Sequence, residues 1–183
     1  MRLWDGRNLR ENLDLGMKRG LHMSSYECCV TRRALPAAGG FGILCGMDGL
    51  RFACQPGCTN CCNVRGYVYL TEKDLQNAAA YVGMTAAEFE AKYIYRTRHV
   101  LRLRKPPRSQ CHFLVESGCS IHAVKPTQCR TFPFWPDLVE SRRSWQSAAK
   151  FCPGIGTGSL IQIGTAMEIA DEMKRAYPTH YGR

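Results

Sequence analysis

The chain has 183 residues, of which 45% are hydrophobic, which is enough for one globular domain or two small ones and argues against disorder of the whole chain. It carries a formal net charge of +10. No apolar run approaches the roughly 20 residues that a membrane-spanning helix needs. The first residues also lack the apolar stretch of a secretory signal. We therefore expect a cytoplasmic protein without a membrane partner.

The amino-terminal part, residues 1–46, differs from the rest of the chain. It contains Cys28, Cys29 and Cys45, has an Ala-Ala-Gly-Gly stretch, and shows no sustained periodicity. We expect a weakly ordered extension here. An alternative hypothesis is that Met47 is the true start and that residues 1–46 come from a misassigned start codon. In either case, residues 47–183 are predicted to form a cysteine-cluster metal-binding domain.

The first predicted elements follow a dense run of cysteines. Residues Gly66–Leu70 are rich in β-forming residues and predict a short strand. Thr71 and Asp74 have the spacing of a capping box, which predicts a helix that begins after Thr71 and ends at Gly83. Thr85 begins a second capping box and a second helix.

Later elements alternate between strand and helix patterns. Residues Val100–Arg104 alternate with a period of two, which predicts a strand with one apolar and one basic face. Residues Cys111–Val115 predict a further strand, Pro126 a short helical turn, and Ser141–Lys150 a helix. Thr165 begins a third capping box and a last helix. The pattern predicts a small α+β domain, stapled by metal, with short strands and three to five helices.

Eight cysteines outside the amino-terminal part form the strongest signal of the chain. Their thiolates are candidate metal ligands because cysteines gathered in a cytoplasmic chain usually hold a metal. The candidates are Cys54, Cys58, Cys61, Cys62, Cys111, Cys119, Cys129 and Cys152. Pro56-Gly57 predicts a tight turn inside the first group. In an extended segment the adjacent Cys61 and Cys62 would point to opposite sides. Either two metal sites share this segment, or one of the pair is structural.

The metal itself is open between zinc and iron. Eight cysteines would fill two four-cysteine sites that hold zinc ions or iron–sulfur clusters such as [4Fe-4S]. Pro153 after Cys152 favours iron–sulfur slightly. We do not favour a disulfide framework, because the total of 11 cysteines is odd. A radical S-adenosylmethionine enzyme is also not favoured, because too few residues follow the first cysteines. We expect Gly154–Gly158 to be a turn that lets Cys152 reach its site.

Three other residues are candidates for roles near the metal. His112 and His122 each lie near a cysteine and are alternative ligands of the type found in mixed cysteine–histidine zinc sites. Arg130 follows Cys129, and we expect it to donate hydrogen bonds toward thiolate sulfur or to bind an anion. The aromatic and proline residues at 132–136 are expected to cover the metal region and exclude water.

A basic stretch between residues 92 and 108 contains no acidic residue. Aromatic residues and a histidine are interleaved with its lysines and arginines, which are Lys92, Arg96, Arg98, Arg102, Arg104, Lys105 and Arg108. Such a segment could bind the backbone of a nucleic acid. It could equally balance thiolate charge or protect an edge strand from aggregation. We favour these last two interpretations over a nucleic-acid partner.

Five blocks of residues, all in order, resemble the YkgJ-type cysteine-cluster family, whose CxxCxxCC domain is described as zinc- or iron-chelating. They are Phe52-x-Cys54-x3-Cys58-x2-Cys61-Cys62, Cys111-x-Phe113-Leu114, Cys119-Ser120-Ile121-His122, Lys125-Pro126-x2-Cys129-Arg130-x-Phe132-Pro133-Phe134 and Phe151-Cys152-Pro153. The resemblance implies metal chelation by these cysteines. The family includes a flagellin lysine N-methylase with a similar domain, which implies methyl transfer as an alternative. This chain departs from the family spacing, because three residues separate Cys54 from Cys58.

The leading prediction is therefore a metal-binding protein that chelates zinc or iron through eight thiolates. The alternatives are an iron–sulfur enzyme of methyl-transfer or redox type and a basic nucleic-acid-binding module. The sequence assigns no catalytic residue.

Overall fold

The computed structural model describes residues 48–63, 66–104 and 110–181. The predicted extension at 1–46 and the proposed start at Met47 lie outside these residues. The described elements, in chain order, are β1 (Gly49–Phe52), α2 (Asn60–Asn63), β2 (Tyr69–Leu70), α3 (Glu72–Tyr81), α4 (Ala86–Tyr93), β3 (Ile94–Arg96), β4 (Leu101–Leu103), β5 (Leu114–Val115), β6 (Gly118–Cys119), the 3-10 helix η1 (His122–Val124), α5 (Thr127–Thr131), α6 (Pro136–Val139), α7 (Arg142–Ala149), β7 (Ile155–Gln162), α8 (Ile163–Ala176) and α9 (Pro178–Tyr181).

These helices and short antiparallel strands confirm the predicted α+β class. Within the described ranges, four helices have eight residues or more, namely α3, α4, α7 and α8. The remaining helices are single turns of four or five residues. No helix in the described part has the length and apolar character needed to cross a bilayer.

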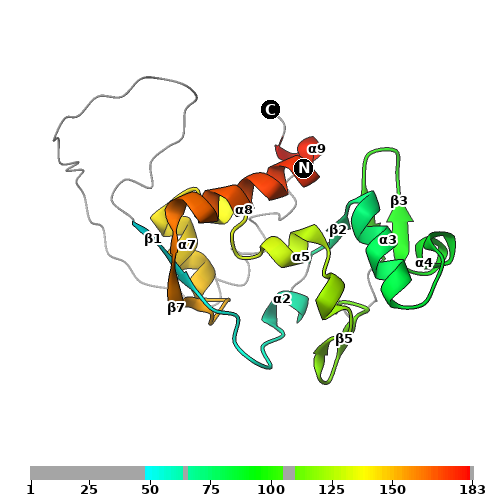
Figure 1. Cartoon of the computed structure of the whole chain (residues 1–183), viewed down its shortest axis with the longest axis horizontal. Helices are drawn as coiled ribbons and strands as arrows, with labels where there is room; N and C mark the ends of the chain where they lie inside the picture. The colour runs from blue at the N-terminus through cyan, green and yellow to red at the C-terminus, as the bar shows by residue number, and fades with distance from the viewer. Residues whose placement is uncertain (1–47, 64–65, 105–109, 182–183) are drawn as a thin grey trace, which may run out of the picture.

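One end of the molecule combines the antiparallel sheet β2-β4-β3 with helices α3 and α4 (Figure 1). Both helices begin with the predicted capping boxes, at Thr71 and Thr85. Helix α3 ends before Gly83, whose φ of 71° suits a glycine. The buried residues of this end are mainly apolar; they include Leu75 and Phe89 from the helices and Ile94, Leu101 and Leu103 from the sheet.

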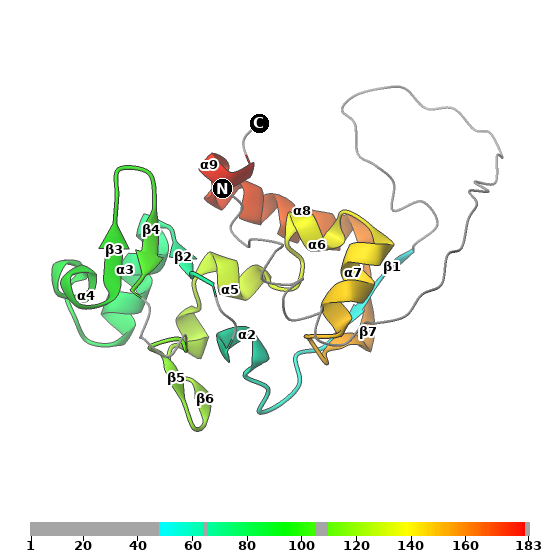
Figure 2. The same cartoon turned by 180° about the vertical axis from the view of Figure 1, so that it is seen from behind.

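The other end is built on the two-stranded pair of β1 and β7, covered by α6, α7 and α8 (Figure 2). The prediction missed both strands. The prediction that Gly154–Gly158 is a turn is wrong for most of this segment, which belongs to β7. Strand β7 pairs with β1, where Leu50 lies opposite Ile161. Gly154 and Gly158 are needed where the chains approach closely. A Cβ at Gly154 would lie 2.4 Å from the carbonyl oxygen of Ala53.

The predicted start of the last helix at Thr165 is wrong. Helix α8 begins at Ile163, directly after β7, and its N-cap residue Gln162 makes no side-chain capping bond. Strand β7 delivers the chain to this point, and Ile163 N donates to the carbonyl of Asp48 beside β1. The tertiary strand pairing therefore sets the start of the helix and overrides the local capping signal. One face of the helix is buried, with Ala170 and Met173 fully enclosed.

Helix α5 lies between the two ends in both views (Figures 1 and 2). Its residue Gln128 is 3% exposed, and its side-chain amide bonds to strand β2 and to the residue two positions before it. Gln128 Oε1 accepts from Tyr69 N at 2.6 Å, and Nε2 donates to Tyr67 O at 3.2 Å. Asp74 on α3 also reaches α5, where it accepts from the N–H and the hydroxyl of Thr127. Buried polar contacts thus fix α5 against the sheet and α3.

We expect Gln128→Leu to lower the free energy of unfolding by about 2 to 4 kcal/mol, because the buried N–H of Tyr69 loses its acceptor and the Tyr67 carbonyl loses a donor. Urea unfolding followed by circular dichroism measures this change. The control is Gln76→Leu on the exposed side of α3, which should change stability by no more than about 0.5 kcal/mol. Equal stability of the two variants would contradict the role given to Gln128.

Candidate metal centre

The segment from β1 to α2 carries the first four cysteines. Its middle is a tight turn, as predicted: Cys58 N donates to Gln55 O at 3.1 Å, with Pro56 and Gly57 between them. Gly57 has a φ of 72°, which the third position of a type II turn requires. Two further bonds hold the segment against the distant chain before β7: Ala53 N donates to Gly154 O, and Asn60 Nδ2 donates to Phe151 O.

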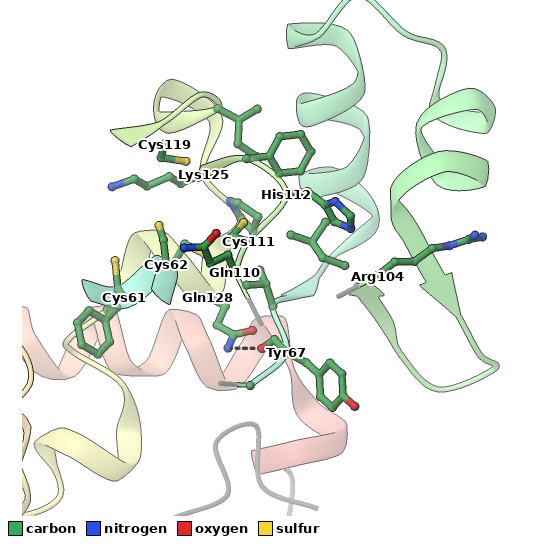
Figure 3. A pocket seen from close by; sticks show the side chains of 18 of the residues that line it. Cys61, Cys62, Tyr67, Arg104, Gln110, Cys111, His112, Cys119, Lys125 and Gln128 are labelled. Atoms are coloured by element: carbon green, nitrogen blue, oxygen red, sulfur yellow. Dashed lines mark hydrogen bonds between the residues drawn. The ribbon is translucent and has the colours of Figure 1, made fainter. Parts of the chain in front are cut away.

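Cys61 and Cys62 lie in the single helical turn α2, not in an extended segment. The turn is closed by a bond from Cys62 N to Thr59 O at 2.9 Å. In Figure 3 both sulfur atoms point to the same side of α2. The segment is not extended, so the reason for expecting the pair to face opposite sides does not apply here. Helical backbone rotates successive side chains by about 100°, so neighbours can share one side of a short turn.

Three more cysteines come to the same place from later in the chain. Cys111 N donates to Cys62 O at 3.3 Å, which anchors the segment before β5 directly to α2. Cys119 ends strand β6 and pairs with Leu114 across the β5–β6 hairpin. Cys129 lies on α5 between the buried Gln128 and the exposed Arg130.

These five cysteines line one pocket (Figure 3). The rest of its lining is largely apolar and includes Val68, Leu103, Phe113, Phe132, Trp135 and Phe151. The prediction that the 132–136 segment covers the cysteine region is supported for Phe132 and Trp135. Phe134 instead packs against Trp145 in the core around β1 and α8. Polar residues at the same pocket are Tyr67, Arg104, Gln110, His112, Lys125 and Gln128.

The Cys62 thiol lies within hydrogen-bond reach of the sulfur atoms of both Cys61 and Cys119. The contact with Cys62, whose single thiol proton the two neighbours share, and the nearby charge of Lys125 together lower the pKa of Cys61 and of Cys119 to about 6. The same contacts raise the pKa of Cys62 far above its ordinary value. At neutral pH the trio therefore favours two thiolates on either side of one thiol.

Burial acts in the opposite direction on the deeper cysteines. Desolvation raises the pKa of Cys129 and of Cys111, and the negative charge of neighbouring cysteines adds to both shifts. A thiolate at these positions lacks water to stabilise it. A cation in the pocket would reverse this, since metal ligation takes the thiolate form.

The other three candidates lie around the pocket and do not line it. Cys152 is buried, and the charges of Cys58 and Cys61 contribute to raising its pKa after desolvation. Cys152 therefore lies near both Cys58 and Cys61. Cys54 is exposed. The structure thus separates the eight cysteines into a pocket group of five and an outer group, Cys54, Cys58 and Cys152.

Within residues 48–63, 66–104 and 110–181, no three Cys, His, Asp or Glu side chains approach one another closely enough to hold a metal ion as they stand. The cysteine sulfur atoms share one pocket, but their present positions do not form a complete metal-coordination site. The arrangement combines thiolates, a charged lysine and an apolar wall. This chemistry suits a thiophilic cation such as zinc or iron.

The two histidine candidates differ in position. His112 lines the pocket, yet Figure 3 places its ring on the side away from the sulfur atoms of Cys61, Cys62 and Cys119. The ring lies against Tyr93 with centroids 5.8 Å apart. His122 is exposed in η1 and is not part of the pocket lining. Neither position brings an imidazole nitrogen into the sulfur group.

Arg130 does not point its guanidinium at a sulfur atom, in contrast to the expectation. Its Nη1 pairs with Glu172 at 2.7 Å, and its Nη2 donates to the Thr127 hydroxyl. The positive charge near the thiolates comes from Lys125, to which the sequence analysis gave no role. Its place just before Pro126, four residues from Cys129, was the signal available in the sequence.

Residues 53–153, more than half of the chain, match the protein family named CxxCxxCC, described as "Putative zinc- or iron-chelating domain". This range contains all eight candidate cysteines. No solved structure shows significant similarity to the chain. The match confirms the resemblance seen in the sequence blocks, and the chain belongs to the CxxCxxCC family of zinc- or iron-chelating domains.

Proposed function

We propose that this protein binds zinc or iron through its eight clustered cysteines, with the pocket group as the principal centre. The observation that carries the proposal is the meeting of Cys61, Cys62, Cys111, Cys119 and Cys129 at one pocket, although they come from four separate places in the chain. Packing alone does not require five thiols to share one cavity wall. Membership of a metal-chelating family supports the same conclusion.

The pocket group fits such a metal in its chemistry. It offers more thiol donors than the four that a tetrahedral zinc site or a [4Fe-4S] cluster takes. Metal binding would draw the side chains together, since sites of this kind close as the protein folds around the metal. Lys125 would offset part of the negative charge that four thiolates leave on a divalent centre.

The outer group, Cys54, Cys58 and Cys152, completes the proposed set. Cys152 lies near both Cys58 and Cys61, so this side would hold either a second metal or alternative ligands of the first. Because Cys61 and Cys62 point to the same side, a division into two sites would run between the pocket group and the outer group. It would not run between the two adjacent cysteines.

A second candidate function is an iron–sulfur enzyme of redox or methyl-transfer type. The observation in its favour is the apolar wall that continues from the cysteines past Val68 and Phe113, where an organic molecule could lie beside the centre. Anaerobic purification can remove this second candidate. A colourless protein with zinc and no acid-labile sulfide removes it, whereas a brown protein with acid-labile sulfide is what the enzyme requires and also fits an iron–sulfur centre that only binds.

We expect Cys129→Ser to lose most of the bound metal and to lower the melting temperature by about 10 °C, because the site contributes directly to folding free energy. Plasma emission spectrometry and calorimetry of the anaerobically isolated protein provide the two measurements. Cys45→Ser is the matched control, since Cys45 lies outside the proposed set, and it should retain metal and melting temperature. Full metal content in Cys129→Ser would refute the assignment of this residue.

A further prediction concerns the metal-free protein. Alkylation of Cys61 and Cys119, followed peptide by peptide, should rise with pH through a midpoint near 6, because their thiolates are stabilised by Cys62. In Cys62→Ala the midpoint should move up toward about 8.5, so the thiolate fraction at pH 7 falls to a few per cent.

The control for this experiment is Cys111→Ala, which removes a neighbouring thiol but leaves the hydrogen bonds of Cys62 in place. Its midpoint for Cys61 should stay near 6. A midpoint that is the same in the parent protein and in Cys62→Ala would show that Cys62 does not control the neighbouring thiols.

A further inference from the structure

An arginine is stacked between two tyrosines on the sheet β2-β4-β3. The guanidinium carbon of Arg102 lies 3.9 Å from the ring centroid of Tyr67 and 4.4 Å from that of Tyr95. Arg102 and Tyr95 are directly paired across β4 and β3. Their neighbours Leu101, Leu103 and Ile94 are buried under α3 and α4. Since side chains alternate along a strand, the stack lies on the opposite face of the sheet.

Both rings of this stack meet solvent. Tyr95 is 47% exposed and Tyr67 is 39% exposed, which places them among the few large exposed apolar side chains of the described residues. Among the described residues, only the guanidinium of Arg102 stacks on the ring of Tyr95. Flat aromatic surfaces exposed on a sheet and backed by arginine are what unpaired bases stack on in single-stranded nucleic-acid complexes.

The charge on this side of the sheet is positive. No Asp or Glu occurs between Glu90 and Glu116. Arg96 does not contribute to the stacked face, because it forms ion pairs with Glu72 and Glu90 from α3 and α4. Arg102 lies in the stack itself, and Arg98 lines the neighbouring pocket. Arg104 instead lines the cysteine pocket, and its Nε donates to the Ile94 carbonyl. Few cations are therefore available for phosphate groups, and stacking has to supply much of the affinity.

The stacked face continues into a second pocket beyond Tyr69. This pocket lies between the β3–β4 turn and the carboxyl-terminal helices, and Arg98, His99 and His180 are among its lining residues. The ion pair of Arg96 with Glu72 also lines it and adds no net charge. The His180 ring packs on Tyr69 with centroids 4.9 Å apart. Its Nδ1 atom is buried and has no hydrogen-bond partner among the described residues. Because Nδ1 is enclosed by the protein, a base in this pocket would contact the exposed part of the half-buried ring and not this nitrogen.

We propose that this face, made by Tyr67, Arg102 and Tyr95 and extended by the pocket at His180, binds single-stranded nucleic acid by base stacking. The function is additional to metal binding and does not depend on it. The sequence suggested a nucleic-acid partner through the whole basic stretch. The structure reassigns that role to one arginine and two tyrosines and removes Arg96 from it.

Fluorescence anisotropy of the holoprotein with labelled probes tests the proposal. The probes are oligouridine and oligothymidine of about 12 nucleotides and an RNA duplex of similar length. We expect either single strand to bind more tightly than the duplex, and the ratio of the two single-strand affinities tells whether RNA or DNA is preferred. Between about 50 and 200 mM salt, the slope of log K against log salt should be shallow, about −1 to −2.

Variants separate stacking from general charge. Tyr95→Ala should weaken single-strand binding about five-fold or more, since one stacked base is lost. Arg102→Lys keeps the charge but loses the planar stack, and it should weaken binding as well. Tyr81→Ala is the matched control, because Tyr81 is 53% exposed on α3, away from the stacked face, and it should bind as the parent protein does. All three variants should keep their metal content.

Three results would overturn the proposal. These are equal binding of the duplex, single-strand affinity of Tyr95→Ala within two-fold of the parent protein, and no anisotropy change with any probe. Competition by heparin that is unaffected by Tyr95→Ala would assign the face to polyanions in general. Loss of metal without loss of binding would leave this proposal standing and count against the metal assignment alone.

Discussion

The buried amide of Gln128 is the contact on which the cysteine pocket depends. The amide accepts from Tyr69 of strand β2 and donates to Tyr67 just before that strand, and Gln128 lies immediately before Cys129 in the chain. Its backbone carbonyl also accepts from the Trp135 indole at 2.8 Å, and its backbone N–H donates to the Tyr177 hydroxyl. One residue therefore connects α5 to the sheet and to the end of α8. Because all these groups are buried, each bond is costly to leave unmade.

Around this fixed helix, the cysteines are brought together by short backbone bonds. Cys111 bonds to Cys62, the chain before α2 bonds to Gly154 and Phe151, and a hairpin presents Cys119. The result is a pocket lined by five cysteines whose pKa values are shifted in opposite directions. Cys61 and Cys119 are stabilised as thiolates by Cys62 and Lys125, whereas Cys129 and Cys111 resist ionisation. A cation would remove this conflict, which is the physical basis of the metal proposal.

The sequence predicted best what is decided locally. The helices beginning after Thr71 and Thr85 follow from bonds between residues three apart, and the Pro56-Gly57 turn from the φ that glycine allows. The strand pair of β1 and β7 could not be predicted this way, because Leu50 meets Ile161 from the far end of the chain. That same pairing displaced the start of α8 from Thr165 to Ile163.

The candidate site shows the same division. The identity of the cysteines was clear from composition and spacing, but their grouping was not. The helical turn of α2, set by the bond from Cys62 to Thr59, turned two adjacent side chains to one side. Lys125 comes close to the thiolates because of the way η1 packs. Arg130 pairs with Glu172 because of the way α8 packs. Neither contact can be predicted from one segment of the sequence.

X-ray absorption spectroscopy of the anaerobically isolated protein tests the central claim most directly, since it identifies both the metal and the atoms around it. The proposal predicts a zinc or iron edge with a first shell made of sulfur alone, at about 2.3 Å. A first shell dominated by nitrogen or oxygen, or a protein isolated anaerobically without zinc or iron, would contradict it.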